Sequence, residues 1–126
     1  MLQDVGMINT LTDLPDSVIG WELDGKLEAS DYTSTLIPAI EAAAGKGPVR
    51  AVVVIPSFDG MSGGAMKEDF KLGVHHVKAL ERMAVVTDLD WMRHFMSLFG
   101  WMVHGELRVF PLAERADAIT WAAGTN

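Results

Sequence analysis

Apolar runs and helix-like repeats alternate along most of the chain. The runs at 51–55 and 83–86 contain no polar positions, which is typical of strands covered on both faces of a parallel sheet. We also predict strands at 5–10, 18–24 and 107–110, and we expect the first two to be neighbours because Asp-Leu-Pro-Asp between them favours a turn. The segment at 18–24 alternates apolar and polar residues, so we place it near an edge of the sheet.

Apolar residues at helical spacing predict helices at 32–44, 66–80, 91–99 and 112–123. Pro38 lies inside the first of these, where its missing N–H and a clash one turn back predict a kink or a late helix start. Asp88 or Asp90 can cap the third helix through a side-chain oxygen. In the last helix we expect the inward positions to be Leu112, Ala116, Ile119 and Ala123.

Glycine and proline residues mark the expected ends of two strands. Gly25 and Lys26 break the alternation of the segment at 18–24, and Pro56 closes the run at 51–55. The Gly- and Ser-containing segment that follows, 57–64, is interpreted as a loop leading into a helix. In α/β proteins the loop that leaves the carboxyl end of a strand commonly carries the binding site, so a site is sought here first.

The order of strands and helices predicts a single α/β domain over residues 1–126, a sandwich with a mostly parallel central sheet of about five strands and about four helices. A chain of 126 residues with 49% apolar residues can form one core of its own. The net charge of −7 disfavours nucleic-acid binding, because phosphate backbones are repelled.

The absence of cysteine excludes disulfides and thiolate chemistry and suits a reducing compartment. Asp4 and Asp13 occupy the region where a secretory signal would be basic and then apolar, and no window has the length of a membrane-spanning helix. We therefore expect a cytoplasmic protein, with membrane contact only at a surface.

Several strings of residues, together with the order of elements, resemble the SpoIIAA-like family, a bacterial relative of the STAS domain that is also grouped with the CRAL-TRIO lipid-transfer fold. The strings are LPDSVIGWELDGKLEASDY, FDGMSGGAMKEDFKLG, RMAVVTDLDWMRHFMSLFGWMVHGELRVFP and LAERADAITW, and the resemblance spans nearly the whole chain. It implies a STAS-like sandwich without enzymatic activity. It also implies binding as the function, since regulatory STAS proteins bind partner proteins and CRAL-TRIO relatives hold an apolar ligand.

One departure from the family pattern bears on mechanism. STAS proteins that antagonise anti-sigma factors carry an acidic residue and a phosphorylatable Ser or Thr just before Ser/Thr-Gly, at the start of the helix after the central strand. The matching positions here are Gly60, Met61, Ser62 and Gly63, so the acidic and phospho-acceptor positions are lost. The resemblance therefore does not predict that kinase-driven switch. Ser62 remains either a helix-capping hydroxyl or a site of regulatory phosphorylation.

The aromatic and methionine-rich segment 91–103 leads to the first functional hypothesis. Such side chains are enriched in cores and at interfaces, so one interpretation is core packing with a homodimer contact. The other is an apolar pocket for a small lipophilic ligand, closed from the opposite side by the loop and helix that follow the central strand. The residues expected to bind this ligand are Met61, Met66, Phe70, Trp91, Phe95, Phe99 and Trp101.

The second hypothesis is a STAS-type regulatory module that binds a protein partner through the loop at 57–64. The expected partner-binding residues are Ser57, Phe58, Asp59, Gly60, Ser62 and Gly63. The glycines of this loop would also permit close approach of an anion, yet the segment matches neither the P-loop nor the dinucleotide-binding glycine pattern. We therefore favour a tight turn into a helix as the explanation of these glycines.

Patterns for catalysis or metal binding are weak. His75 and His76 are adjacent on a predicted helix and point about 100° apart, which does not suit one metal ion. His94 and His104 are isolated, and no G-x-S-x-G motif occurs. The two aspartates after the 83–86 strand lie where catalytic carboxylates often occur, but helix capping explains them. We therefore predict a non-enzymatic binding domain without a metal or cofactor.

Overall fold

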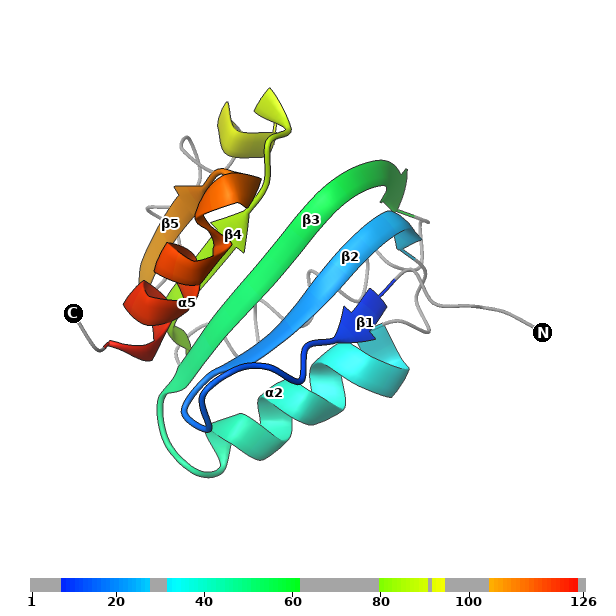
Figure 1. Cartoon of the computed structure of the whole chain (residues 1–126). Helices are drawn as coiled ribbons and strands as arrows, with labels where there is room; N and C mark the ends of the chain where they lie inside the picture. Colours follow the sequence, from blue (N-terminus) through cyan, green and yellow to red (C-terminus); the bar gives the residue numbers. More distant parts are fainter. Residues whose placement is uncertain (1–7, 28–31, 62–79, 91, 95–104, 125–126) are drawn as a thin grey trace.

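The computed structural model describes residues 8–27, 32–61, 80–90, 92–94 and 105–124. Five strands form one sheet in the order β1-β2-β3-β4-β5 (Figure 1). Their bounds are Ile8–Thr10 for β1, Ile19–Leu27 for β2, Val49–Met61 for β3, Leu80–Val86 for β4 and Glu106–Phe110 for β5. β1 is antiparallel to β2, and the other neighbours are parallel. The predicted α/β class, with a mostly parallel five-stranded sheet, is confirmed.

Helices lie on both faces of this sheet (Figure 1). α2 (Ile37–Ala44) follows a π-helical turn, η1 (Tyr32–Leu36), and α5 (Arg115–Ala123) follows a 3₁₀ turn, η4 (Leu112–Glu114). Residues 90 and 92–94 are also helical. The predicted helix at 66–80 falls outside the described residues except for Leu80, which begins β4 and does not end a helix.

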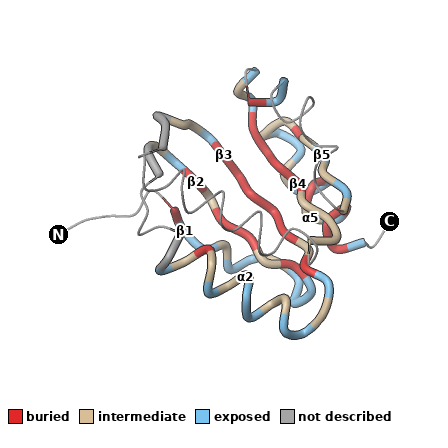
Figure 2. Tube along the Cα trace, turned by 180° about the vertical axis from the view of Figure 1, so that it is seen from behind, coloured by how far each residue is buried: buried red, intermediate tan, exposed pale blue. Residues whose placement is uncertain are grey.

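Alternate residues of β3 divide the core into two apolar clusters. The buried positions lie mainly along β2, β3 and β4 in the middle of the sheet and along α5 (Figure 2). The cluster on the α2 face contains the buried residues Ile8, Trp21, Leu23, Leu36, Ala51, Val53, Ile55, Val85 and Met92. The cluster on the α5 face contains the buried residues Val18, Val52, Val54, Ala84, Val86, Phe110, Ala118, Trp121, Ala122 and Ala123. β3 and β4 therefore contribute to both clusters, as the unbroken apolar runs predict.

The position of Pro38 decides where α2 begins. Pro38 lies in the first turn of α2, where its missing N–H is tolerated. The residues just before it form the wider π-helical turn rather than an α-helix. Because proline has no N–H to offer the carbonyl four residues earlier, an α-helix beginning at Tyr32 would lack a hydrogen bond there. The expectation of a late helix start is confirmed.

Pro56 does not close β3, which continues to Met61. The ladder with β2 changes register at this point, so that Ile55 and Pro56 together lie opposite Leu23 in a β-bulge. On the other side the ladder with β4 has already ended at Val54. A proline is tolerated where the ladder does not need its N–H. The predicted strand end at Pro56, and with it the predicted loop start at Ser57, is wrong.

β2 likewise does not stop at Gly25 and Lys26, because it continues to Leu27. Gly25 has a φ of +100°, which glycine adopts without steric cost, and a second change of register follows it. Here the glycine allows the strand to bend and does not end it. As a result, β2 and β3 continue as a two-stranded ribbon past the last pair between β3 and β4 (Figure 1).

The inward face of the last helix also differs from the expectation. Ala116 is exposed, Leu112 and Ile119 are partly buried, and Ala118, Trp121, Ala122 and Ala123 are buried. The 3₁₀ turn at the start of this segment has three residues per turn instead of 3.6, which shifts the phase of the residues that follow. The expected inward position of Ala116 is therefore wrong, whereas that of Ala123 is confirmed.

Candidate functional site

The predicted site residues are divided between β3 and segments that the structure does not describe. Ser57, Phe58, Asp59, Gly60 and Met61 all belong to β3. The remaining predicted residues, namely Ser62, Gly63, Met66, Phe70, Trp91, Phe95, Phe99 and Trp101, lie outside the described residues. Of the expected ligand-binding residues, the described part of the chain therefore contains Met61, which ends the strand that carries Ser57, Phe58, Asp59 and Gly60.

Ser57 and Asp24 are paired across the β2–β3 ladder just beyond the bulge. The Ser57 hydroxyl donates a hydrogen bond to Asp24 Oδ1. This side-chain hydrogen bond joins the two strands across the ladder. Ser57 is therefore a strand residue with a structural hydrogen bond, rather than part of an open loop.

Phe58 and Met92 bring two distant parts of the chain into one apolar cluster. Met92, in the helical segment after β4, is only 5% exposed. Phe58 and Leu89 are partly buried against the same cluster, on the α2 face. The continuation of β3 and the start of the helix after β4 are therefore joined by apolar packing at the carboxyl edge.

Thr87 links three strands at this edge. It is fully buried at 0% exposure, and its hydroxyl donates to the backbone oxygen of Ile55 at 2.9 Å. The same hydroxyl oxygen accepts from the backbone N–H of Leu89 at 3.2 Å, and the Thr87 N–H donates to the Phe110 oxygen at 2.8 Å. β3, β4 and β5 are thus tied together where any site on this edge would begin. Sequence reasoning missed Thr87, although a single hydroxyl directly after an apolar run was a readable signal.

Asp88 forms a hydrogen bond across the carboxyl edge to a separate part of the chain. Its Oδ1 accepts a hydrogen bond from the backbone N–H of Leu112 at 3.0 Å, which ties the loop after β4 to the start of η4. The Thr87 hydroxyl oxygen accepts a hydrogen bond from the backbone N–H of Leu89, the residue just before the helix begins. Asp88, one of the two aspartates expected to cap this helix, thus also takes a partner from the loop after β5.

Trp21 presents an unusual buried polar group on the α2 face. Its side chain is 1% exposed in the apolar cluster, in line with Val53 across the ladder. Within the described part of the chain, its indole Nε1 is the one buried side-chain nitrogen or oxygen without a hydrogen-bond partner. Buried polar groups are normally paired, so this N–H calls for an explanation.

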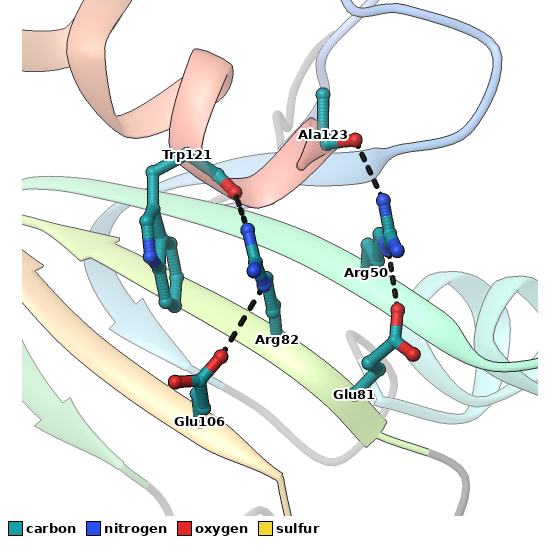
Figure 3. Close-up of polar contacts among 6 residues, drawn as sticks. All are labelled: Arg50, Glu81, Arg82, Glu106, Trp121 and Ala123. Carbon is teal, nitrogen blue, oxygen red and sulfur yellow. Dashed lines mark hydrogen bonds and ion pairs between the residues drawn. The ribbon is translucent and has the colours of Figure 1, made fainter. Parts of the chain in front are cut away.

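A second polar cluster surrounds the carboxyl end of α5 (Figure 3). Arg50 Nη1 donates to the backbone oxygen of Ala123 at 2.6 Å, and Arg82 Nη1 donates to that of Trp121 at 2.6 Å. The Arg82 guanidinium also lies 5.2 Å from the centroid of the Trp121 ring, within cation–π range. These cations satisfy the last carbonyls of the helix and complement its dipole. We therefore assign this cluster to the fold.

A hollow of about 470 Å³ lies at the opposite edge of the sheet, near the amino ends of β3 and β4. Its walls include Ala42 and Lys46 near the end of α2, and Arg50 and Glu81 at the starts of the two strands. Arg50 and Glu81 are already joined to each other at 2.5 Å. Ligands of α/β sheets bind outside the carboxyl ends of the strands, so we place the candidate site at the other edge.

Two kinds of feature are missing from the described residues. No group of three or more His, Asp or Glu side chains among them is arranged to hold a metal ion. None of their helices combines the length and the hydropathy that crossing a membrane requires.

Comparison with known proteins agrees with the fold. A family model described as SpoIIAA-like matches residues 18–123. The chain is 26% identical to an uncharacterised protein of the DUF3478 family with a SpoIIAA-like fold from Shewanella loihica PV-4, whose crystal structure superposes with a TM-score of 0.79 over 97% of this chain and 98% of that one. A search of curated proteins found no match. The resemblance predicted from the sequence strings is confirmed: the chain belongs to the SpoIIAA-like family.

Proposed function

We propose that this chain is a binding domain without enzymatic activity, which holds a small lipophilic ligand at the carboxyl edge of its sheet, on the α2 face. The observation that supports this most is the shared apolar cluster of Phe58 and Met92. Phe58 comes from the continuation of β3 and Met92 from the helix after β4, so two separate elements contribute apolar side chains to one cluster at the edge where α/β folds bind ligands.

The expected ligand-binding residues are distributed around these two positions in the sequence. Met61 ends the strand that carries Phe58, and Trp91 and Phe95 flank Met92. Methionine side chains adapt to irregular apolar shapes, and aromatic rings supply large contact areas. A small lipophilic molecule is the ligand class that suits such a lining.

The polar groups of this edge support binding rather than catalysis. The hydroxyl proton of Ser57 goes to Asp24, and that of Thr87 goes to the Ile55 backbone oxygen. Asp88 accepts the N–H of Leu112. A nucleophile needs a base as its hydrogen-bond partner, and the Thr87 hydroxyl, which donates to a backbone oxygen, has none.

Native mass spectrometry of freshly purified protein, followed by organic extraction, tests this proposal without a guess at the ligand. A lipophilic molecule bound at one per chain supports it and identifies the chemical class. Protein that carries no such molecule and binds no lipophilic probe contradicts it.

A pair of variants tests the location of the site. Phe58→Ala removes a partly buried ring from the α2-face cluster, whereas Ile119→Ala removes partly buried apolar surface from the α5-face cluster. We expect Phe58→Ala to weaken binding of diphenylhexatriene about tenfold, because apolar contact is lost, and Ile119→Ala to bind like the wild type. Equal weakening by both variants, each shown to be folded by circular dichroism, would place the ligand elsewhere.

A further inference from the structure

Trp21 raises a question that the proposed apolar site alone does not answer. Its indole N–H is buried, and none of the described residues accepts a hydrogen bond from it. The side chains packed around it in its cluster are apolar, and Thr10, its partner across the β1–β2 ladder, makes no hydrogen bond with the indole N–H. The backbone carbonyls within a sheet are used by its ladders. The fold thus places a donor in apolar surroundings without giving it an acceptor.

The backbone next to this cluster is also irregular. η1 is a π-helical turn, and Leu36 at its end is buried in the same cluster as Trp21. π-helical turns are rare and occur frequently at functional sites. The unpaired indole and the widened turn are independent features, and both belong to the α2 face.

We infer that the ligand of this domain is a neutral lipophilic carbonyl compound, such as an ester, ketone or amide, whose oxygen accepts the hydrogen bond of Trp21 Nε1. This inference rests on the function proposed above and specifies its ligand. A hydrocarbon would leave the N–H unpaired. A carboxylate would have to give up its hydration among apolar side chains. A neutral carbonyl satisfies the donor at a much lower desolvation cost than a carboxylate.

Methyl decanoate and decane form a matched pair of probes, since the two differ by the ester group. The variant Trp21→Phe keeps an aromatic ring and removes the N–H. The control variant Trp121→Phe makes the same change in the cluster on the α5 face. Binding of each probe to the three proteins is measured by titration and followed in the indole region of ¹H–¹⁵N spectra.

We expect Trp21→Phe to bind methyl decanoate about fivefold to tenfold more weakly than the wild type, the loss that one hydrogen bond brings. Decane should bind both proteins equally, and Trp121→Phe should resemble the wild type with both probes. In the wild type, methyl decanoate should move one indole N–H signal to lower field, and this should be the signal missing from Trp21→Phe.

The results separate the inference from the function on which it rests. Equal affinity of wild type and Trp21→Phe for the ester overturns the carbonyl assignment and leaves lipophilic binding in place. Absence of binding of both probes to the wild type overturns both. If Trp21→Phe does not fold, the wild-type spectra decide: an indole signal that moves with the ester and not with decane supports the assignment, and four unmoved signals overturn it.

Discussion

Arg50 donates a hydrogen bond to the backbone oxygen of Ala123 at 2.6 Å, joining the central strand to the last turn of α5 (Figure 3). The last carbonyls of a helix have no partner within the helix, and a cation at this end also complements the helix dipole. The Arg50 guanidinium is held in place by Glu81, whose Oε1 lies 2.5 Å from its Nε. The salt bridge at the start of β3 and β4 therefore also fixes α5 on the sheet.

Replacement of Arg50 by methionine should destabilise the protein. The variant loses a charge-assisted hydrogen bond that is partly exposed, so we expect the free energy of unfolding to fall by about 1–2 kcal/mol. Urea denaturation measures the difference. Arg93→Met serves as the control, because Arg93 is exposed and its side chain makes no hydrogen bond or ion pair with the described residues. If the two variants unfold at the same urea concentration, the contact with Ala123 does not stabilise the fold.

Gly124 should not tolerate a side chain. Its φ is +75°, and a Cβ there would lie 2.5 Å from Arg50 Nη1. We expect Gly124→Ala to lower the free energy of unfolding by about 1–2 kcal/mol, through backbone strain and displacement of the arginine. Gly45→Ala is a matched control at the end of α2, because Gly45 has a φ of −67° and its nearest contact would be at 3.6 Å. That variant should be neutral or stabilised by up to about 1 kcal/mol, and an equal loss in both would contradict the geometry.

Much of this fold could be predicted from the sequence because buried parallel strands carry a strong signal. The apolar runs at 51–55 and 83–86 lie within β3 and β4, and their alternate residues enter the two clusters. The late start of α2 could also be predicted from Pro38, because the missing N–H of a proline acts on the residues next to it in sequence. Such features depend on residues close together in sequence.

The errors arose where a neighbouring strand changed the meaning of a residue. Pro56 and Gly25 read as strand ends, but each lies at a change of register in the β2–β3 ladder. Register depends on the partner strand, which a single segment does not reveal. The hydrogen bond from Leu112 to Asp88 could not be foreseen for the same reason, because Leu112 comes from a separate part of the chain.

The candidate site was predictable in outline only. The position at the carboxyl end of β3 follows from the general behaviour of α/β sheets. Neither the meeting of Phe58 with the Met92 cluster nor the unpaired indole of Trp21 can be read from spacing, because both depend on packing across the sheet. The residues that make a site specific here are thus ones that the sequence presents as ordinary core.

The pair formed by Asp13 and Arg115 should make stability depend on pH. Arg115 donates to both carboxylate oxygens at 3.0 Å, which lowers the pKa of Asp13 below its ordinary value of 3.8. A carboxyl whose pKa is lower in the folded state stabilises the fold above its unfolded pKa, and this contribution is lost as the pH falls through the folded pKa. Asp13→Asn should therefore unfold at a lower urea concentration than the wild type at pH 7, and the difference should shrink below about pH 3.8.

Asp16→Asn provides the matched control for this pH series. It removes the same charge from the same loop, and Asp16 has no ion pair with the described residues. Its urea midpoint should stay close to that of the wild type at each pH. A deficit of Asp13→Asn that persists undiminished in acid would show that the carboxylate acts through its shape rather than its charge.

Thr87→Val tests whether the carboxyl edge is held by a buried hydroxyl. Valine has nearly the same shape, but it leaves the Ile55 oxygen and the Leu89 N–H without the partners that Thr87 gives them. We expect a loss of about 1–3 kcal/mol in the free energy of unfolding, together with faster hydrogen exchange at the Leu89 amide. Thr120→Val is the control, because this exposed hydroxyl bonds to the oxygen of Ala116 within its own helix, and its change should stay within about 0.5 kcal/mol. Unchanged protection of the Leu89 amide in a fully stable Thr87→Val variant would mean that the three strands are held by their backbone ladders alone.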